Sequence, residues 1–135
     1  MDIAELHSRA LDATRGVIAG IRQGQWAAPT PCQGWDVRAL VNHVVAGNLW
    51  AAYGPVPGAV YAGHRFIDVL IHGWDVAVAT SQETKLSPVL VDACLDIVAP
   101  QAELLRASGV FGDKIELPDA SDAQTRLLAT LGRRA

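Results

Sequence analysis

The chain has 135 residues, of which half are hydrophobic and 19% are charged, and its formal net charge is −3 at pH 7. This length and apolar content predict a single domain spanning residues 1–135 and exclude extensive disorder. The acidic balance and the lack of any lysine and arginine cluster argue against a nucleic-acid partner. The longest apolar tract, residues 69–80, contains His72 and Asp75 and is too short to cross a bilayer, so no membrane partner is expected.

The N-terminal residues mix charges of both signs with apolar side chains and hold no unbroken apolar core, so we expect no export signal. Cys32 and Cys94 lie far apart in the sequence. In a chain without an export signal, two such cysteines are expected to be free thiols in a reducing environment. The sequence therefore predicts a cytoplasmic protein.

Residues 3–22 carry apolar side chains at a mostly helical spacing, and Gly24 ends this run. The next segment, residues 26–35 (WAAPTPCQGW), holds two prolines and a glycine between two tryptophans, which predicts an ordered connector. Asp36 follows as the expected N-cap of a second helix that runs to about residue 52, with His43 at the border of its apolar stripe.

A turn or short extended link at residues 53–59 should lead into a third helix over about residues 60–80. Ser87 then predicts the N-cap of a fourth helix, residues 88–109, which begins with a proline. Pro100 lies inside this run and is expected to kink it.

Residues 111–117 are expected to be extended. Ser121 and Gln124 predict a capping box for a short final helix that closes at Gly132. The order of elements predicts an all-α protein, a bundle of about four main helices followed by a short extended segment and a terminal helix.

Asp68, His72 and Asp75 are the polar side chains in the otherwise apolar residues 66–79. Their offsets of four and three bring them to one face of a helix, and one turn rises about 5.4 Å, so a carboxylate and an imidazole can converge on one ion. His43 from the second helix would complete a three-ligand metal site with a position left for water or substrate, as in catalytic centres. Asp75 would then fix the tautomer and orientation of His72.

A plainer interpretation makes the same residues a narrow solvent-facing strip on an otherwise buried helix. In the second interpretation they line an internal site. An unpartnered buried carboxylate or imidazole costs roughly several kcal/mol, so such groups are usually paired or bound to a metal. His64 is either a further ligand or an exposed residue near the helix start, and His7 is expected at the surface. Cys32 precedes the His43 helix, and is either a thiol activated by the helix dipole or a packing residue.

Three blocks of the chain resemble signatures of the mycothiol-dependent maleylpyruvate isomerase and DinB-like metal-binding superfamily: WAAPTPCQGWDVRALVNHVVAG, RFIDVLIHGWDVAVAT and DASDAQTRLLATLGR. The resemblance implies a DinB-like helical bundle that holds a divalent metal ion on His43, Asp68 and His72, with zinc expected and nickel or another ion as the alternative. It also implies thiol-dependent transfer or isomerisation with a small thiol such as mycothiol, although many relatives are known only as metal-binding proteins.

The chain departs from this family pattern in two ways. Asp68 stands where the isomerase carries a Glu-x-x-x-His pattern, and its shorter arm should shift or weaken the metal. Only residues 53–59 join the His43 helix to the His72 helix, where relatives carry several dozen more residues, including a helix. A bundle short of one helix would expose an apolar flank, so we expect a homodimer that covers the gap, with exchanged helices as one way to do so.

Three functional hypotheses follow, and we rank them in this order. The first is a metal-dependent thiol transferase or isomerase that acts on a small molecule. The second is a non-catalytic, dimeric metal- or ligand-binding module derived from such an enzyme. The third is a helical interaction module that holds no metal.

Overall fold

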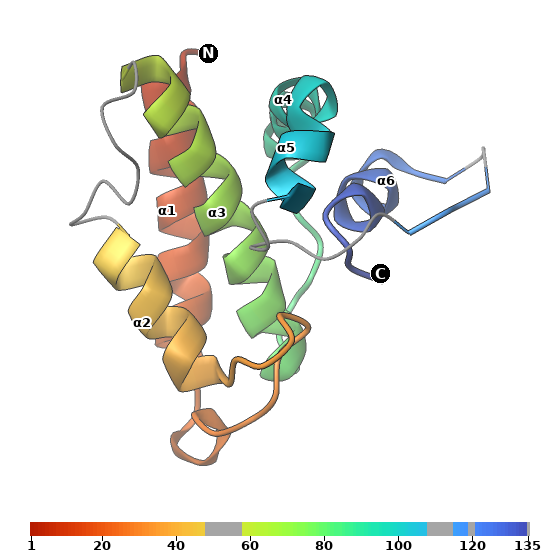
Figure 1. Ribbon diagram of the computed structural model, residues 1–135. Coiled ribbons are helices and arrows are strands. Elements are labelled where there is room, and N and C mark those ends of the chain that lie inside the picture. The colour runs from red at the N-terminus through yellow and green to blue at the C-terminus, as the bar shows by residue number, and fades with distance from the viewer. Residues whose placement is uncertain (48–57, 108–114, 119–120, 135) are drawn as a thin grey trace. The chain divides into compact units, whose positions relative to one another are not determined.

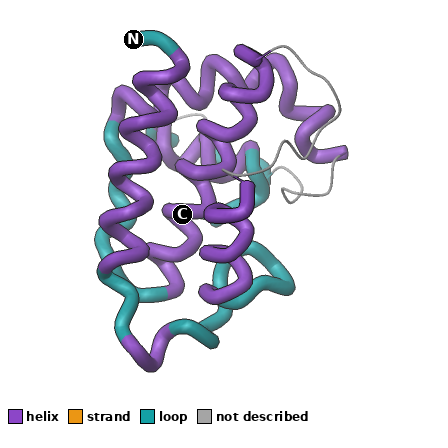
Figure 2. The backbone as a smooth tube through the Cα atoms, turned by 90° about the vertical axis from the view of Figure 1, so that its left-hand side faces the viewer, coloured by secondary structure: helices purple, strands orange, loops and turns teal. Residues whose placement is uncertain are grey.

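The computed structural model describes residues 1–47, 58–107, 115–118 and 121–134 (Figure 1). Over these ranges the protein is all-α, as the sequence predicts, and Figure 2 shows helices and loops but no strand. None of the helices in the same ranges is both long and apolar enough to cross a membrane. Contacts within the chain divide it into two compact units, Met1–Lys85 and Leu86–Ala135. The single domain expected from the chain length stays a prediction.

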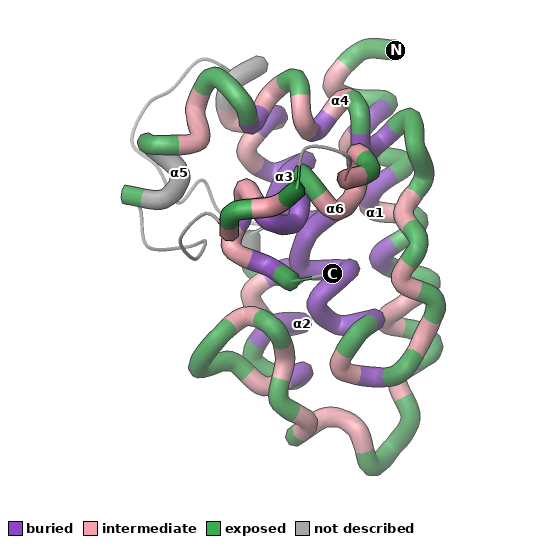
Figure 3. Tube along the Cα trace, turned by 90° about the vertical axis from the view of Figure 1, so that its right-hand side faces the viewer, coloured by how far each residue is buried: buried purple, intermediate pink, exposed green. Residues whose placement is uncertain are grey.

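The first unit is organised around its longest helix. Its helices are α1 (Ile3–Ala19), α2 (Val37–Gly47) and α3 (Gly58–Ala79), with a 3-10 turn, η1 (Gln23–Gln25), after α1. Both α1 and α2 pack on α3, and α3 is buried without interruption from residue 65 to residue 77 (Figure 3). A helix that is apolar on almost every face requires such cover on several sides.

The start of α2 confirms the predicted N-cap, because the Ala39 backbone N–H donates to Asp36 Oδ1 at 2.8 Å. The connector before it folds back onto the helix: the Val37 N–H donates to the Ala28 carbonyl at 3.0 Å. Gly34 has φ +85°, a left-handed conformation that glycine adopts without strain. The connector is therefore ordered, as its sequence predicts. The predicted end of the second helix and residues 53–57 of the predicted link lie outside the described residues.

The second unit contains α4 (Pro88–Val98), the 3-10 turn η2 (Ala99–Gln101), α5 (Ala102–Ala107) and α6 (Ala123–Thr130). Pro100 lies in η2, so the predicted kink takes the form of one tighter turn between two α-helices. The chain leaves α6 through Gly132, whose φ of +79° confirms the predicted glycine closure.

The predicted capping box of the last helix is wrong. Asp122 is the N-cap, and its Oδ1 accepts from the Thr125 N–H at 2.7 Å. The Ser121 hydroxyl donates to the Pro118 carbonyl instead, and the Gln124 side chain accepts from the Leu86 N–H at 2.9 Å. A carboxylate next in the chain competes well with serine for this position, because its charge also interacts favourably with the helix dipole.

The close approach of α1 to α3 depends on one glycine. The Thr14 hydroxyl donates to the Val69 carbonyl at 2.9 Å, and both groups are buried. A Cβ at Gly73 would lie 2.2 Å from Thr14 Oγ1, which is far inside van der Waals contact. Only glycine at position 73 therefore lets the threonine reach the backbone of α3.

Replacing Gly73 with alanine should destabilise the protein by about 1–3 kcal/mol, because the two helices must shift to admit the methyl group. Gly16→Ala in α1 is the matched control, since nothing lies within 4 Å of a Cβ there. Alanine should stabilise that position by about 0.5–1 kcal/mol through helix propensity. Chemical unfolding followed by circular dichroism measures both. Equal or greater stability of Gly73→Ala would contradict the close packing.

Candidate metal centre

The polar stripe of α3 lies inside the first unit. Asp68, His72 and Asp75 are 8%, 1% and 0% exposed, so the interpretation as a solvent-facing strip is wrong. Because α2 packs on α3, the stripe meets side chains of α2 rather than water. Buried ionisable groups are stable only when paired, hydrogen-bonded or bound to an ion, so the partners of these three residues decide what the site can do.

The structure brings His43, Asp68 and His72 together. The Nε2 atoms of His43 and His72 each lie 3.1 Å from Asp68 Oδ1. The two imidazole rings are 5.0 Å apart between centroids and nearly perpendicular, at 87°. One donor atom from each of the three residues lies within 4.8 Å of the other two. Two imidazole nitrogens and one carboxylate oxygen thus converge on one point between α2 and α3.

His72 lies between two carboxylates. Its Nδ1 is 3.1 Å from Asp75 Oδ2, on the opposite side of the ring from Asp68. Burial lowers the pKa of His72, but hydrogen bonds to Asp68 and Asp75 outweigh burial and raise that pKa above its ordinary value. Burial likewise raises the pKa of Asp68, yet hydrogen bonds from His43 and His72 hold it well below its usual range. The two carboxylates thus favour the protonated form of the His72 ring.

Arg65 is a residue of the site that the sequence reasoning missed. Its side chain is buried, Nη1 donates to Asp68 Oδ2 at 2.5 Å, and Nη2 donates to the Val44 carbonyl at 3.3 Å. The guanidinium holds one oxygen of Asp68 and leaves the other to the two imidazoles. The opposite charges three positions apart on one helix were the available sequence signal.

His7 lies near Arg65, and its burial differs from the expectation that it lies at the surface. This histidine is half-buried in α1 rather than at the surface. Burial and, to a smaller degree, the Arg65 charge lower the pKa of His7, which favours its neutral form. Neither His7 nor His64 belongs to a potential metal-ligand group among the described residues.

The connector contributes Cys32 and Trp35 to the same region. The Trp35 ring packs edge-on against His43 with 4.8 Å between centroids, and it is 38% exposed, so it borders the site toward solvent. Cys32 is half-buried, and its Sγ lies within 4.8 Å of donor atoms of His72 and Asp75. It also packs against the apolar cluster formed by Val37, Leu40, Val41 and Val76. Cys32 is thus both a packing residue and a neighbour of the histidine.

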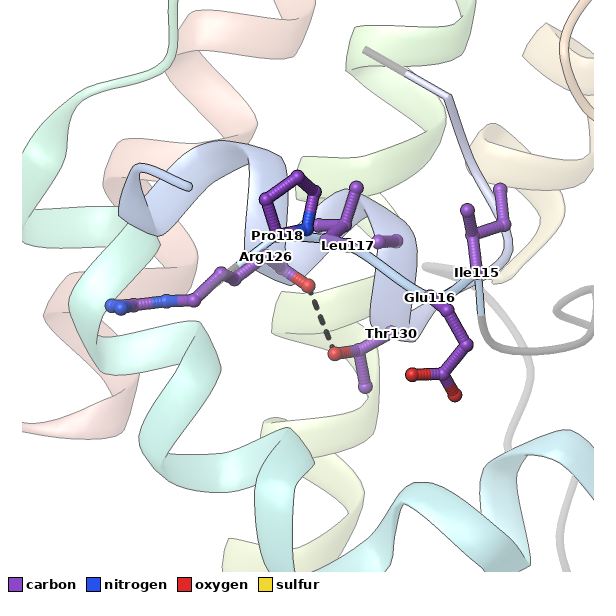
Figure 4. A pocket seen from close by; sticks show the side chains of 7 residues that line it. Ile115, Glu116, Leu117, Pro118, Arg126 and Thr130 are labelled. Atoms are coloured by element: carbon purple, nitrogen blue, oxygen red, sulfur yellow. Dashed lines mark hydrogen bonds between the residues drawn. The ribbon is translucent and has the colours of Figure 1, made fainter. Parts of the chain in front are cut away.

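A separate pocket of about 300 Å³ lies in the second unit, between residues 115–118 and α6 (Figure 4). Its charged side chains, Glu116 and Arg126, point in opposite directions, and Thr130 donates to a backbone carbonyl of its own helix. This lining brings no group of catalytic or metal-binding side chains together.

Comparison with known proteins gives two results. A family model described as "Mycothiol maleylpyruvate isomerase N-terminal domain" matches residues 7–54, which include the connector and α2. Two curated proteins of Mycobacterium tuberculosis, Uncharacterized protein MT0763 (strain CDC 1551 / Oshkosh) and Uncharacterized protein Rv0738 (strain ATCC 25618 / H37Rv), are each 32% identical over 182 residues, covering 98% of this chain and 98% of the relative. No solved structure matches.

The alignment with both relatives is longer than the chain itself, 182 positions against 135 residues. It therefore places gaps opposite several dozen residues of the relatives. This agrees with the prediction, made from the family pattern, that the chain is shorter than its relatives. That the missing residues fall between the His43 and His72 helices stays a prediction.

Proposed function

The chain belongs to the mycothiol maleylpyruvate isomerase N-terminal domain family, and we propose that it binds one divalent metal ion on His43, Asp68 and His72 and uses it in thiol-dependent transfer or isomerisation. The observation that carries this proposal is the convergence of two imidazole nitrogens on a single oxygen of Asp68, at 3.1 Å each. A small molecule with a mycothiol-type thiol as co-substrate is the class of reactants that the family suggests.

The donor set fits a zinc ion. Zinc binds histidine nitrogen and aspartate oxygen at about 2.0–2.2 Å, which places tetrahedral donors about 3.5 Å apart. The three donor atoms here lie within 4.8 Å of one another, so modest side-chain rotations close them around an ion. Nickel also accepts imidazole ligands and is the alternative. When bound on three protein ligands, such an ion lowers the pKa of a thiol or water at the remaining position.

The residues around the ligands have distinct roles in this proposal. Asp75 accepts a hydrogen bond from the Nδ1–H of His72 and so presents Nε2 to the ion, and Arg65 holds the second oxygen of Asp68. His43 is the most exposed of the three ligands, with 30% of its side chain accessible. Substrate would therefore approach on the His43 side, past the ring of Trp35.

Removal of either histidine ligand tests the centre. In His72→Ala we expect metal affinity to fall by more than about 100-fold, since even outer residues cost 10–100-fold, and in His43→Ala we expect weaker binding because the ion loses one of its three ligands. Asn42→Ala is the matched control, because this residue is exposed and precedes His43 on the same helix. Elemental mass spectrometry of tag-free protein gives the metal content per chain. Full metal content in both histidine variants would refute the site.

The proton on His72 predicts a pH dependence. Because the folded metal-free protein holds that proton with a raised pKa, an ion at Nε2 must displace it. The apparent Kd for zinc should therefore rise as pH falls, by about tenfold per unit once His72 is protonated, and the weakening should begin above the ordinary histidine pKa of 6.5. Competition titrations with a chromophoric chelator across pH measure it. A Kd independent of pH would contradict proton displacement at His72.

A non-catalytic, dimeric metal-binding module is the second candidate, and the shortened chain favours it. Loss of several dozen residues could remove one wall of a substrate pocket and expose an apolar face that a second copy covers. Light scattering should then give the mass of a dimer. Thiol-dependent turnover that His43→Ala abolishes would decide for the enzyme, and metal binding without turnover would decide for the module.

A further inference from the structure

The surroundings of the His72 ring are nearly symmetric. Each ring nitrogen lies 3.1 Å from a carboxylate oxygen, Nε2 from Asp68 and Nδ1 from Asp75. Beyond Asp68 lies His43, which completes the centre proposed above. A second group of donors shares this ring, because Cys32 Sγ, a nitrogen of His72 and an oxygen of Asp75 also lie within 4.8 Å of one another. The carboxylate of this group, Asp75, is the one that faces Nδ1.

The backbone of Cys32 makes two hydrogen bonds within the connector. Its N–H donates to Thr30 Oγ1 at 3.1 Å, and its carbonyl accepts from the Trp35 N–H at 3.1 Å. These hydrogen bonds give the connector a defined conformation around Cys32. His72 and Asp75, its two neighbours, are 1% and 0% exposed, and Cys32 is half-buried, so two of the three donors lie in the interior of the unit.

We propose that Cys32, His72 and Asp75 form a second metal position, with a thiolate ligand, and that one thiophilic divalent ion per chain occupies either this position or the His43–Asp68–His72 position. The inference goes beyond the proposed function and shares only His72 with it. Cysteine sulfur, imidazole nitrogen and carboxylate oxygen are all zinc ligands, with bond lengths of about 2.0–2.3 Å. When the ion binds, the thiol proton and the second proton of a charged His72 ring are released to solvent.

Occupation of the two positions is mutually exclusive because a neutral imidazole has one nitrogen with a free lone pair. An ion bound at Nε2 leaves the ring proton on Nδ1, which then donates a hydrogen bond to Asp75. An ion bound at Nδ1 leaves the ring proton on Nε2, which then donates a hydrogen bond to Asp68. In both states the carboxylate that does not bind the ion orients the ring. The ring need not turn between the two states.

Charge and ligand softness separate the two positions. A thiolate and the Asp75 carboxylate together neutralise a divalent ion in a buried place, where uncompensated charge is costly. The His43 position offers nitrogen and oxygen donors alone, and its Asp68 charge is shared with Arg65. Ions that prefer sulfur should therefore favour Cys32, and ions that prefer nitrogen and oxygen should favour His43.

Cobalt(II) as a substitute for zinc gives a direct test, since sulfur-to-cobalt charge transfer absorbs in the near ultraviolet and a site without sulfur lacks it. We expect at most one cobalt per chain and this absorption in the wild type. It should be at least as strong per bound cobalt in His43→Ala, and absent in Cys32→Ser, which should still bind cobalt. Cys94→Ala is the matched control and should keep the absorption, because Cys94 is fully buried in α4 and burial raises its pKa to about 12.

Other results would contradict one or both of the metal positions. Bound cobalt without sulfur absorption in the wild type, absorption that persists in Cys32→Ser, or two cobalt ions per chain would overturn the second position as stated. Absorption in the wild type with no cobalt bound by Cys32→Ser would instead remove the His43 position and leave the Cys32 position standing. Failure of the wild type to bind cobalt or zinc would overturn both.

Discussion

The buried charges of α3 are the constraint on which the first unit depends. Asp68, His72 and Asp75 lie in a helix that is covered on almost every face, and each would be costly there alone. They become tolerable because they share protons with one another and with His43, and because Arg65 supplies a further positive charge. The cover that excludes water also makes these interactions strong, so packing of the helix and chemistry of the site have the same physical origin.

Burial of α3 depends in turn on neighbours that approach it closely. On one side Gly73 lets the Thr14 hydroxyl of α1 reach the backbone of α3. On another side α2 brings His43 and an apolar cluster against it, while the connector folds back to add Cys32. The same contacts that bury the polar stripe therefore set the distances within it, and a ligand cannot move without disturbing the core.

The sequence predicted those features of this arrangement that depend on residues close together in the chain. Helical offsets placed Asp68, His72 and Asp75 on one face, and residue type predicted the Asp36 cap and the break at Pro100. The choice of Asp122 over Ser121 as a cap was missed, since neighbouring residues with similar capping preference differ by a fraction of a kcal/mol. The approach of Cys32 to His72 could not be predicted, because tertiary packing joins residues forty positions apart.

The shortening of the chain bears on chemistry more than on ligand binding. Every residue assigned to either metal position comes from the connector, α2 or α3, and these segments hold one another in place through contacts within the first unit. Segments that the relatives have and this chain lacks are therefore not needed to assemble the donors. Catalysis requires, in addition to a metal, walls that exclude water and orient a substrate. Ion binding and turnover are therefore separate properties, and both have to be measured in this protein.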